Sequence, residues 1–257
     1  MSTRTSHRTD AIALRSIDYG ESDKIVTFMT SDFGKICGIA KGARRSRKRF
    51  INALEPYTRL SLIFSTKGHD TLSLIEEADI VDHYSAIRGD LERTLAASYL
   101  VDLVDQFSRD GKLNADLFNL LGDVLGIMAK NGSSEILIRI FELRLLKLVG
   151  YEPVLDRCLG CRMPLRNEVF YVFSPAEGGL RCRTCSTKSP DPIPVCLGTI
   201  KSLLMGKEIH LDRIHCLSLS GRSAKESREL LSAFIQHILG VELKSARVVR
   251  EINNLLA

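Results

Sequence analysis

Apolar and polar positions alternate in the first third of the chain, which is the pattern of half-buried β-strands. Turn residues separate the alternating segments, and Ser31-Asp32-Phe33-Gly34 is the strongest hairpin signal because Gly34 can take a positive φ. Three such strands, a longer gap and a two-strand hairpin follow the order of a five-stranded OB barrel, so residues 10–82 are predicted to form an OB-fold domain. The predicted strands are Ala11–Ser16, Lys24–Thr30, Lys35–Lys41, Arg59–Phe64 and Thr71–Glu76.

From Gly89 onward the apolar residues recur every three or four positions, which is the period of amphipathic helices. The pattern predicts an α-helical domain of residues 83–156 and 190–257, and hence an α+β, multidomain fold. The signals for individual helices are an apolar stripe from Leu91 to Phe107, a second helix capped by Asn114, a third over Glu135–Val149 capped by Ser133 or Ser134, and later helices over Gly198–Met205 and over Ala224–Leu239 with Ser223 as cap.

The third predicted helix is apolar nearly all round, which is typical of a helix at the centre of a bundle. Arg139 and Arg144 interrupt its apolar surface. Each arginine is expected either to extend its guanidinium to solvent or to lie in a groove that faces a partner.

Two CxxC pairs interrupt the helical pattern between Tyr151 and Pro194. Two such turns, twenty residues apart, can complete a tetrahedral shell of four thiolates around Zn²⁺. A closed shell leaves no position for substrate, so the expected role of one zinc ion is structural. Residues 157–189 are therefore predicted to be a four-cysteine zinc module inserted in the helical domain, and redox use of the pairs is the alternative. The predicted ligands are Cys158, Cys161, Cys182 and Cys185.

Composition changes this picture little. The chain has 257 residues, of which 44% are apolar and 26% charged, as in ordinary globular proteins. No apolar stretch is long enough for a membrane span, and residues 1–9 read as a flexible tail without the apolar core of a signal peptide. The odd number of cysteines, seven, favours metal binding over a disulfide scaffold and a reducing, cytoplasmic location.

Positive charge is concentrated in the segment Gly34–Phe50, which contains no acidic residue. Its second half, Gly42–Arg49, has almost nothing to bury and is predicted to project as a loop. A cationic loop at the end of a strand suits a phosphate backbone, and the alternative is a solvated charge run that keeps the protein soluble. Phe33, Phe50 or Tyr57 could stack on bases or belong to the core. The predicted DNA-binding residues are Lys35, Lys41, Arg44, Arg45, Arg47, Lys48 and Arg49.

Catalytic motifs are absent from the sequence: it has no GxxxxGK[ST], GxGxxG, GxSxG or HExxH pattern. No pair or triad of carboxylates has the setting of a two-metal nuclease. The sequence is therefore interpreted as that of a binding protein rather than an enzyme.

Several segments resemble the RecO family of bacterial recombination mediators, and the resemblance extends from about Asp10 to Arg247. Ala40-Lys41-Gly42-Ala43-Arg44-Arg45 is similar to the start of the family, and Phe141-Glu142-Leu143 to its central helix. The tail Leu243–Arg247 resembles a family LKSR motif with one residue inserted or shifted. The other matching segments are Gly20-Glu21-Ser22-Asp23, Leu54-Glu55-Pro56 and the run Phe173–Cys182.

The resemblance implies a nucleoid-associated protein of DNA repair and recombination whose OB domain binds single- and double-stranded DNA and anneals complementary strands. It implies RecR and the acidic C-terminal tail of single-strand-binding protein as partners, and loading of RecA onto DNA. Arg139 matches an arginine just before the family's Phe-Glu pair that takes part in docking the acidic tail.

Two other functions remain open at this point. The chain could be chiefly an adaptor whose helical domain recruits partner proteins while the barrel touches DNA weakly. It could also be an RNA-binding zinc protein of the translation apparatus, because OB folds and zinc ribbons both occur there.

Overall fold

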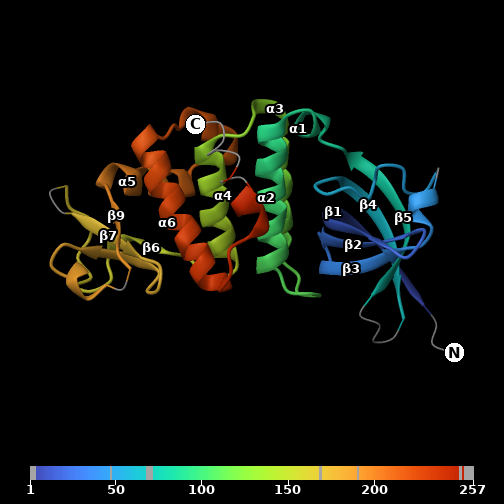
Figure 1. The fold of residues 1–257 in the computed structure, drawn as a ribbon, viewed down its shortest axis with the longest axis horizontal. Coiled ribbons are helices and arrows are strands. Elements are labelled where there is room, and N and C mark those ends of the chain that lie inside the picture. Colours follow the sequence, from blue (N-terminus) through green and yellow to red (C-terminus); the bar gives the residue numbers. More distant parts are fainter. Residues whose placement is uncertain are drawn as a thin grey trace. The chain divides into compact units, whose positions relative to one another are not determined.

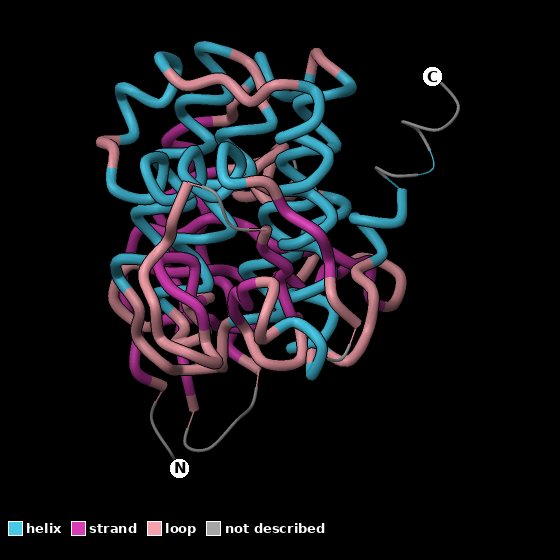
Figure 2. The backbone as a smooth tube through the Cα atoms, turned by 90° about the vertical axis from the view of Figure 1, so that its left-hand side faces the viewer, coloured by secondary structure: helices cyan, strands magenta, loops and turns pink. Residues whose placement is uncertain are grey.

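The chain divides into two compact units in the computed structural model, which describes residues 4–46, 48–67, 72–167, 170–189, 191–248 and 251. Unit 1 is built on Met1–Gly132 and unit 2 on Ser133–Arg247 (Figure 1). Each unit combines strands with helices. Figure 2 colours the helices and strands of the whole chain. The predicted α+β fold is therefore confirmed.

Unit 1 begins with a five-stranded barrel in the order β1-β2-β3-β5-β4, which closes because β4 also pairs with β1. The pair β3–β5 is parallel and the other pairs are antiparallel. Inward-facing residues of all five strands form its core, among them the fully buried Val26, Phe28 and Leu62. The strands are β1 (Thr5–Tyr19), β2 (Asp23–Thr30), β3 (Gly34–Ala40), β4 (Arg59–Thr66) and β5 (Ser73–Asp82).

The first strand starts six residues earlier than the sequence predicts, so the predicted tail of residues 1–9 is wrong for residues 5–9. Thr5 pairs with Thr66 of β4, and the hydroxyl of Thr9 donates to the Asp32 carboxylate at 2.6 Å. Residues 5–9 are polar and carry no strand pattern of their own. Pairing with β4 satisfies their backbone groups, which is a tertiary effect that propensity does not report.

Three helices complete unit 1: α1 (Ser85–Arg88), α2 (Leu91–Phe107) and α3 (Ala115–Asn131). The side chains of Asp90 and Asn114 accept hydrogen bonds from backbone N–H groups and cap α2 and α3. Both helices contact the barrel strands, and the boundary between the compact units falls after Gly132. The division into an OB domain ending at residue 82 and a separate helical domain stays a prediction.

Unit 2 combines helices with a small sheet of order β6-β8-β7-β9. α4 contacts both α5 and α6, as expected for a helix that is apolar nearly all round. Ser220 rather than the predicted Ser223 caps α6. The elements are α4 (Glu135–Leu148), β6 (Val154–Cys158), β7 (Tyr171–Ser174), β8 (Gly179–Cys182), β9 (Ile193–Val195), α5 (Leu197–Glu208) and α6 (Gly221–Leu239).

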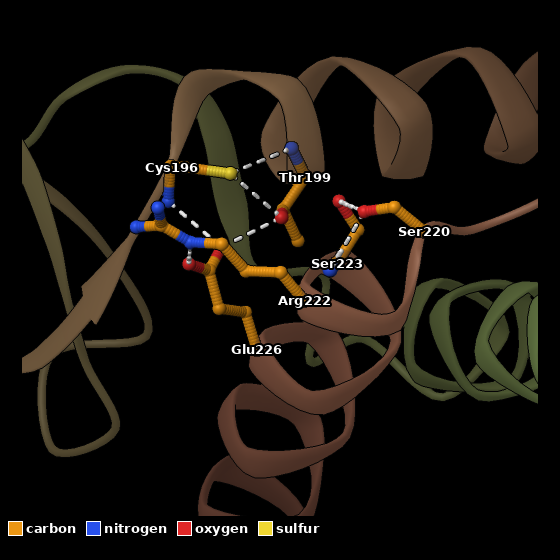
Figure 3. A network of polar contacts seen from close by, with 6 residues as sticks. All are labelled: Cys196, Thr199, Ser220, Arg222, Ser223 and Glu226. Carbon is orange, nitrogen blue, oxygen red and sulfur yellow. Dashed lines mark hydrogen bonds and ion pairs between the residues drawn. The ribbon is translucent and has the colours of Figure 1, made fainter.

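A polar network joins the start of α5 to α6 (Figure 3). The Glu226 carboxylate of α6 accepts a hydrogen bond from the backbone N–H of Cys196 at 2.9 Å and from the Thr199 hydroxyl at 2.6 Å. The Arg222 Nε donates to its other oxygen at 2.7 Å. Burial alone would raise the pKa of Glu226, but these donors, Thr199 first, lower it to about 2.

We predict that Glu226→Gln lowers the free energy of unfolding by about 1–3 kcal/mol near pH 7, because the ionised acceptor is lost. The pKa of this carboxyl falls from its ordinary 4.5 to about 2 on folding. The wild-type advantage should therefore be complete above pH 4.5 and decline as the pH falls towards 2. Urea unfolding at several pH values measures it. Glu229→Gln, an exposed position of the same helix, is the control, and an equal loss in both variants would contradict the assignment.

We also predict that Gly34→Ala destabilises unit 1 more than Gly42→Ala. Both glycines have a positive φ, +68° and +69°, so each alanine adds about 1 kcal/mol of backbone strain. A Cβ at Gly34 would lie 2.2 Å from the carbonyl oxygen of Lys112, whereas one at Gly42 meets no atom within 4 Å. The overlap should lower the free energy of unfolding of Gly34→Ala by about 2 kcal/mol more, as measured by urea unfolding. Equal urea midpoints for the two variants would show that the backbone at Lys112 moves away from the added methyl group without a loss of stability, which would contradict the prediction.

Candidate nucleic-acid interface and metal centre

The segment Gly42–Arg49, here named the basic loop, follows β3 and is fixed to the turn between β1 and β2. The Gly42 N–H donates to Asp23 Oδ1 at 2.8 Å, and the Arg44 N–H donates to the carbonyl oxygen of Ser22 at 2.9 Å. The hydrogen bond from Gly42, followed by that from Ser22, lowers the pKa of Asp23. The loop is thus held by an ionised carboxylate at its first residue.

The loop also buries more than its composition suggests. Ala43 opens a short 3-10 helix, Ala43–Arg45, and belongs to the barrel core together with Phe50, which follows the loop. Both ends of the basic loop are therefore anchored. Its long cationic side chains are the part that is exposed to solvent.

The structure separates Lys35 from the other predicted DNA-binding residues. Its Nζ donates to the carbonyl oxygen of Asp105 at 2.8 Å and lies 3.2 Å from the Asp105 carboxylate and 3.6 Å from that of Asp110. Only 15% of the side chain is exposed. Lys35 joins β3 to α2, and its charge is compensated within unit 1.

Two arginines of the basic loop pair with acids of the β1–β2 hairpin. Arg44 Nε lies 3.4 Å from Asp18, and Arg45 lies 3.9 Å from the largely exposed Glu21. Arg44 also donates to the carbonyl oxygens of Gly20 and Glu21 at 3.5 Å and 3.3 Å. These surface pairs are weak and can exchange for a phosphate.

The other predicted DNA-binding residues are the most available for contact with a ligand. Lys41 and Lys48 are exposed and form no ion pair with any residue that the structure describes. Arg49 donates to the Lys41 carbonyl at 3.3 Å and its guanidinium lies 5.1 Å from the centre of the Phe50 ring. Arg47 lies outside the described residues. Arg45, Lys48 and Arg49 thus present positive charge to solvent from the basic loop, and Lys41 does so from the position directly before it.

Of the three aromatic residues considered from sequence for base stacking, two are buried and the third, Phe33, is half-buried against the barrel core. Phe50 and Tyr57 are buried, and Arg88 lies 4.5 Å above the Tyr57 ring. Phe33 packs edge-on against Phe64 of the barrel core, with 5.2 Å between ring centres. The exposed aromatic residue beside the basic loop is Tyr19 at the end of β1, which the sequence analysis missed.

The four predicted zinc ligands come together at the ends of β6 and β8, where the two CxxC turns begin. Their Sγ atoms all lie within 4.8 Å of one another, and the Cys161 and Cys182 sulfurs are 3.8 Å apart. A Zn–S distance of about 2.3 Å gives a tetrahedral edge of about 3.8 Å, so the thiols fit a tetrahedral zinc ion.

Local geometry prepares the site for a cation. Burial alone would raise the pKa of Cys158, but backbone N–H groups of Cys161, Cys182 and Gly160 lower it to about 6. The hydrogen bond with Cys182, followed by burial, raises the pKa of Cys185 to about 12. Four thiols this close ionise together only around a metal ion. A Cβ on Gly160 would lie 2.8 Å from Cys185 Sγ, so the first turn needs glycine.

No second cluster of this kind is found. Within the described ranges, these cysteines are the one group of three or more His, Cys, Asp or Glu side chains close enough to share a metal ion. Over the same ranges, no helix has the length and apolarity to cross a bilayer.

Arg139, the predicted partner-binding residue, lies inside unit 2. Its Nη1 is 2.9 Å from Glu142, one helical turn away on α4, and the two side chains are 5% and 0% exposed. Its Nε is 3.9 Å from Glu135, which also pairs with Arg228 of α6. Arg144 is likewise held internally by the carbonyl oxygen of Gly206 at 3.4 Å. Direct contact of Arg139 with a partner stays a prediction.

Comparison with known proteins adds an independent finding. A family model described as "Recombination protein O N terminal" matches residues 1–84, and one described as "Recombination protein O C terminal" matches residues 88–247. A protein of Syntrophus aciditrophicus named "DNA repair protein RecO" is 48% identical over 257 residues, 99% of each chain. Proteins of the same name from Anaeromyxobacter dehalogenans and Halalkalibacterium halodurans are 38% and 29% identical over 95% and 97% of this chain and 96% of their own length.

For the metal centre we predict one tightly bound zinc ion per chain, measured by inductively coupled plasma mass spectrometry. Cys161→Ser should lose the ion and unfold unit 2 at lower urea concentration, because metal binding contributes directly to folding. Cys216→Ser, an exposed cysteine outside the cluster, should keep both metal and stability. A metal-free preparation with four freely titratable thiols at these positions would refute the assignment.

Proposed function

Because this chain belongs to the RecO family of DNA repair proteins, we propose that it is a recombination mediator that binds DNA without altering its bonds. In this proposal it binds single- and double-stranded DNA and anneals complementary strands. With RecR, it helps to load RecA onto DNA coated by single-strand-binding protein. Its place is the nucleoid of the bacterial cytoplasm.

The exposed cations of the basic loop, together with Lys41 directly before it, are the observation that carries the proposal. Lysine and arginine are as numerous as aspartate and glutamate in residues 1–132, so unit 1 has no general attraction for polyanions. Attraction must be local, and Lys41, Arg45, Lys48 and Arg49 supply it. Neutralising phosphates with these side chains releases counterions from DNA, which makes binding favourable at low salt.

Unit 2 has a different role in this proposal. Cys158, Cys161, Cys182 and Cys185 hold one zinc ion, which supplies folding energy and no catalysis. RecR and the acidic tail of single-strand-binding protein would dock on its helices. Arg139 would act by stabilising α4 through Glu142 rather than by touching the tail, because it is 5% exposed.

An adaptor that touches DNA weakly is the alternative favoured by one observation. Lys35 is fully engaged within unit 1, and Arg44 and Arg45 already have acidic partners. Fewer charges are therefore free than the sequence suggests. Strand annealing separates the two functions, since an adaptor would not accelerate pairing of naked complementary oligonucleotides.

We predict that Lys48→Ala/Arg49→Ala weakens binding of a single-stranded oligonucleotide and makes log K fall less steeply with log salt concentration. Loss of two phosphate contacts should reduce the slope by about 1.4. Fluorescence anisotropy across a salt series measures it. Lys112→Ala/Lys130→Ala removes the same charge from exposed positions of unit 1 outside the loop and should keep the wild-type slope.

Annealing of oligonucleotides coated with single-strand-binding protein should fall in parallel in the loop variant. If that variant retains wild-type affinity and slope, DNA binds elsewhere on the chain. If the wild type ignores oligonucleotides even in dilute buffer, or cuts them, the proposed function is wrong.

A further inference from the structure

Strand register defines one face of the barrel that the helices leave partly open. Residues paired directly across antiparallel strands point to the same side of the sheet. On the outer side of β1, β2 and β3 this produces four successive rows, which are Ile12–Met29–Lys35, Arg15–Thr27–Cys37, Ile17–Ile25–Ile39 and Tyr19–Asp23.

Burial differs sharply between these rows. Ile12 and Met29 are fully buried in the structure, where α2 and α3 contact the first strands. At the other end Ile17 is 41% exposed and Tyr19 54% exposed. Ile25 and Ile39, which lie in the same row as Ile17, are half-buried. We name Ile17, Tyr19, Ile25, Cys37 and Ile39 the open strip.

Positive charge borders the open strip. Arg15 is exposed within the same face of β1, and Lys41 directly follows β3. Asp23, which pairs with Tyr19 across the two strands, accepts a hydrogen bond from the N–H of Gly42. Arg44 donates to the carbonyl oxygen of Gly20, the residue after Tyr19, so the strip and the basic loop are continuous.

The occupant must match a small apolar surface with an exposed ring and cations at its edges. A stable protein partner usually needs about 20 residues from each side, whereas the open strip offers five. Single-stranded nucleic acid is bound by this combination of a basic groove and stacking side chains. Duplex bases are already stacked on one another and present only phosphates. The strip therefore suits unpaired bases.

We propose that Tyr19, supported by Ile17, is a stacking site for unpaired bases and gives the barrel its preference for single strands over duplexes. This rests on the proposed DNA-binding function and adds the site that distinguishes strand type. The basic loop holds phosphates of either form, and the open strip binds only the unpaired one. A strand that anneals leaves the strip because its bases stack within the new duplex.

The test compares Tyr19→Ala with Tyr19→Phe, which keeps the ring. Anisotropy with single-stranded, abasic and duplex oligonucleotides of equal length is the readout. Tyr19→Ala should bind the single strand about 5- to 150-fold more weakly, the range of one base–aromatic contact. Its duplex affinity and its salt slope should stay unchanged. Tyr19→Phe and Tyr151→Ala, an exposed tyrosine of unit 2, should bind as the wild type.

The abasic oligonucleotide gives a second criterion, because it offers phosphates without bases. Wild type and Tyr19→Ala should bind it equally. Alkylation of Cys37, followed by peptide mass spectrometry, is a third: a bound single strand should slow it, whereas Cys216 of unit 2 should react at an unchanged rate.

The outcomes keep the two proposals apart. If Tyr19→Ala binds single strands like the wild type while Lys48→Ala/Arg49→Ala does not, the basic loop binds DNA and the stacking site is refuted. Equal weakening of single-strand and duplex binding would also overturn the stacking site. If the wild type binds neither form, the DNA-binding function itself fails.

Discussion

The hydrogen bond between the Gly42 N–H and the Asp23 carboxylate determines where unit 1 presents its positive charge. It fixes a loop of cations to the turn between β1 and β2, in a unit whose residues 1–132 have equal numbers of basic and acidic side chains only when the loop is counted. A flexible chain with the same composition would distribute those charges over many positions. Here the backbone N–H groups of Gly42 and Arg44 are already hydrogen-bonded to the β1–β2 turn, so positioning these two residues requires little further loss of conformational entropy on binding.

Unit 2 obtains its order from polar interactions more than its apolar helix α4 suggests. Four thiols meet between two short strands, and Glu226 connects the start of α5 to α6 through three donors. Arg139 and Glu142 form an ion pair in the interior, which is costly to break because each would leave an uncompensated buried charge. The Glu226 network thus connects two helices, and the thiol cluster brings together two turns that lie more than twenty residues apart in the sequence.

The sequence was most informative where local chemistry decides the structure. Alternation, turn glycines and CxxC spacing predicted five strands and four converging thiols, because each signal acts over a few residues. Tertiary partners decided the rest. Residues 5–9 became a strand because β4 offered an edge, Lys35 was compensated by Asp105 from a helix seventy residues away, and Phe50 was buried by the barrel. Nothing near Tyr19 in the sequence shows that helices cover Ile12 and leave the end of β1 open.

The acidic partners of Arg44 and Arg45 have a consequence for how polyanions are selected. Asp18 and Glu21 already occupy the positions that phosphates would take, so an incoming phosphate replaces one anion by another. The two guanidinium groups have then lost part of their hydration before a phosphate arrives. The net electrostatic gain from binding the phosphate is smaller than it would be for an unpaired arginine. Isolated phosphates gain little from such an exchange, whereas a polymer that displaces both carboxylates at once gains by multivalency. Competing carboxylates of this kind therefore favour reversible binding of such a polymer.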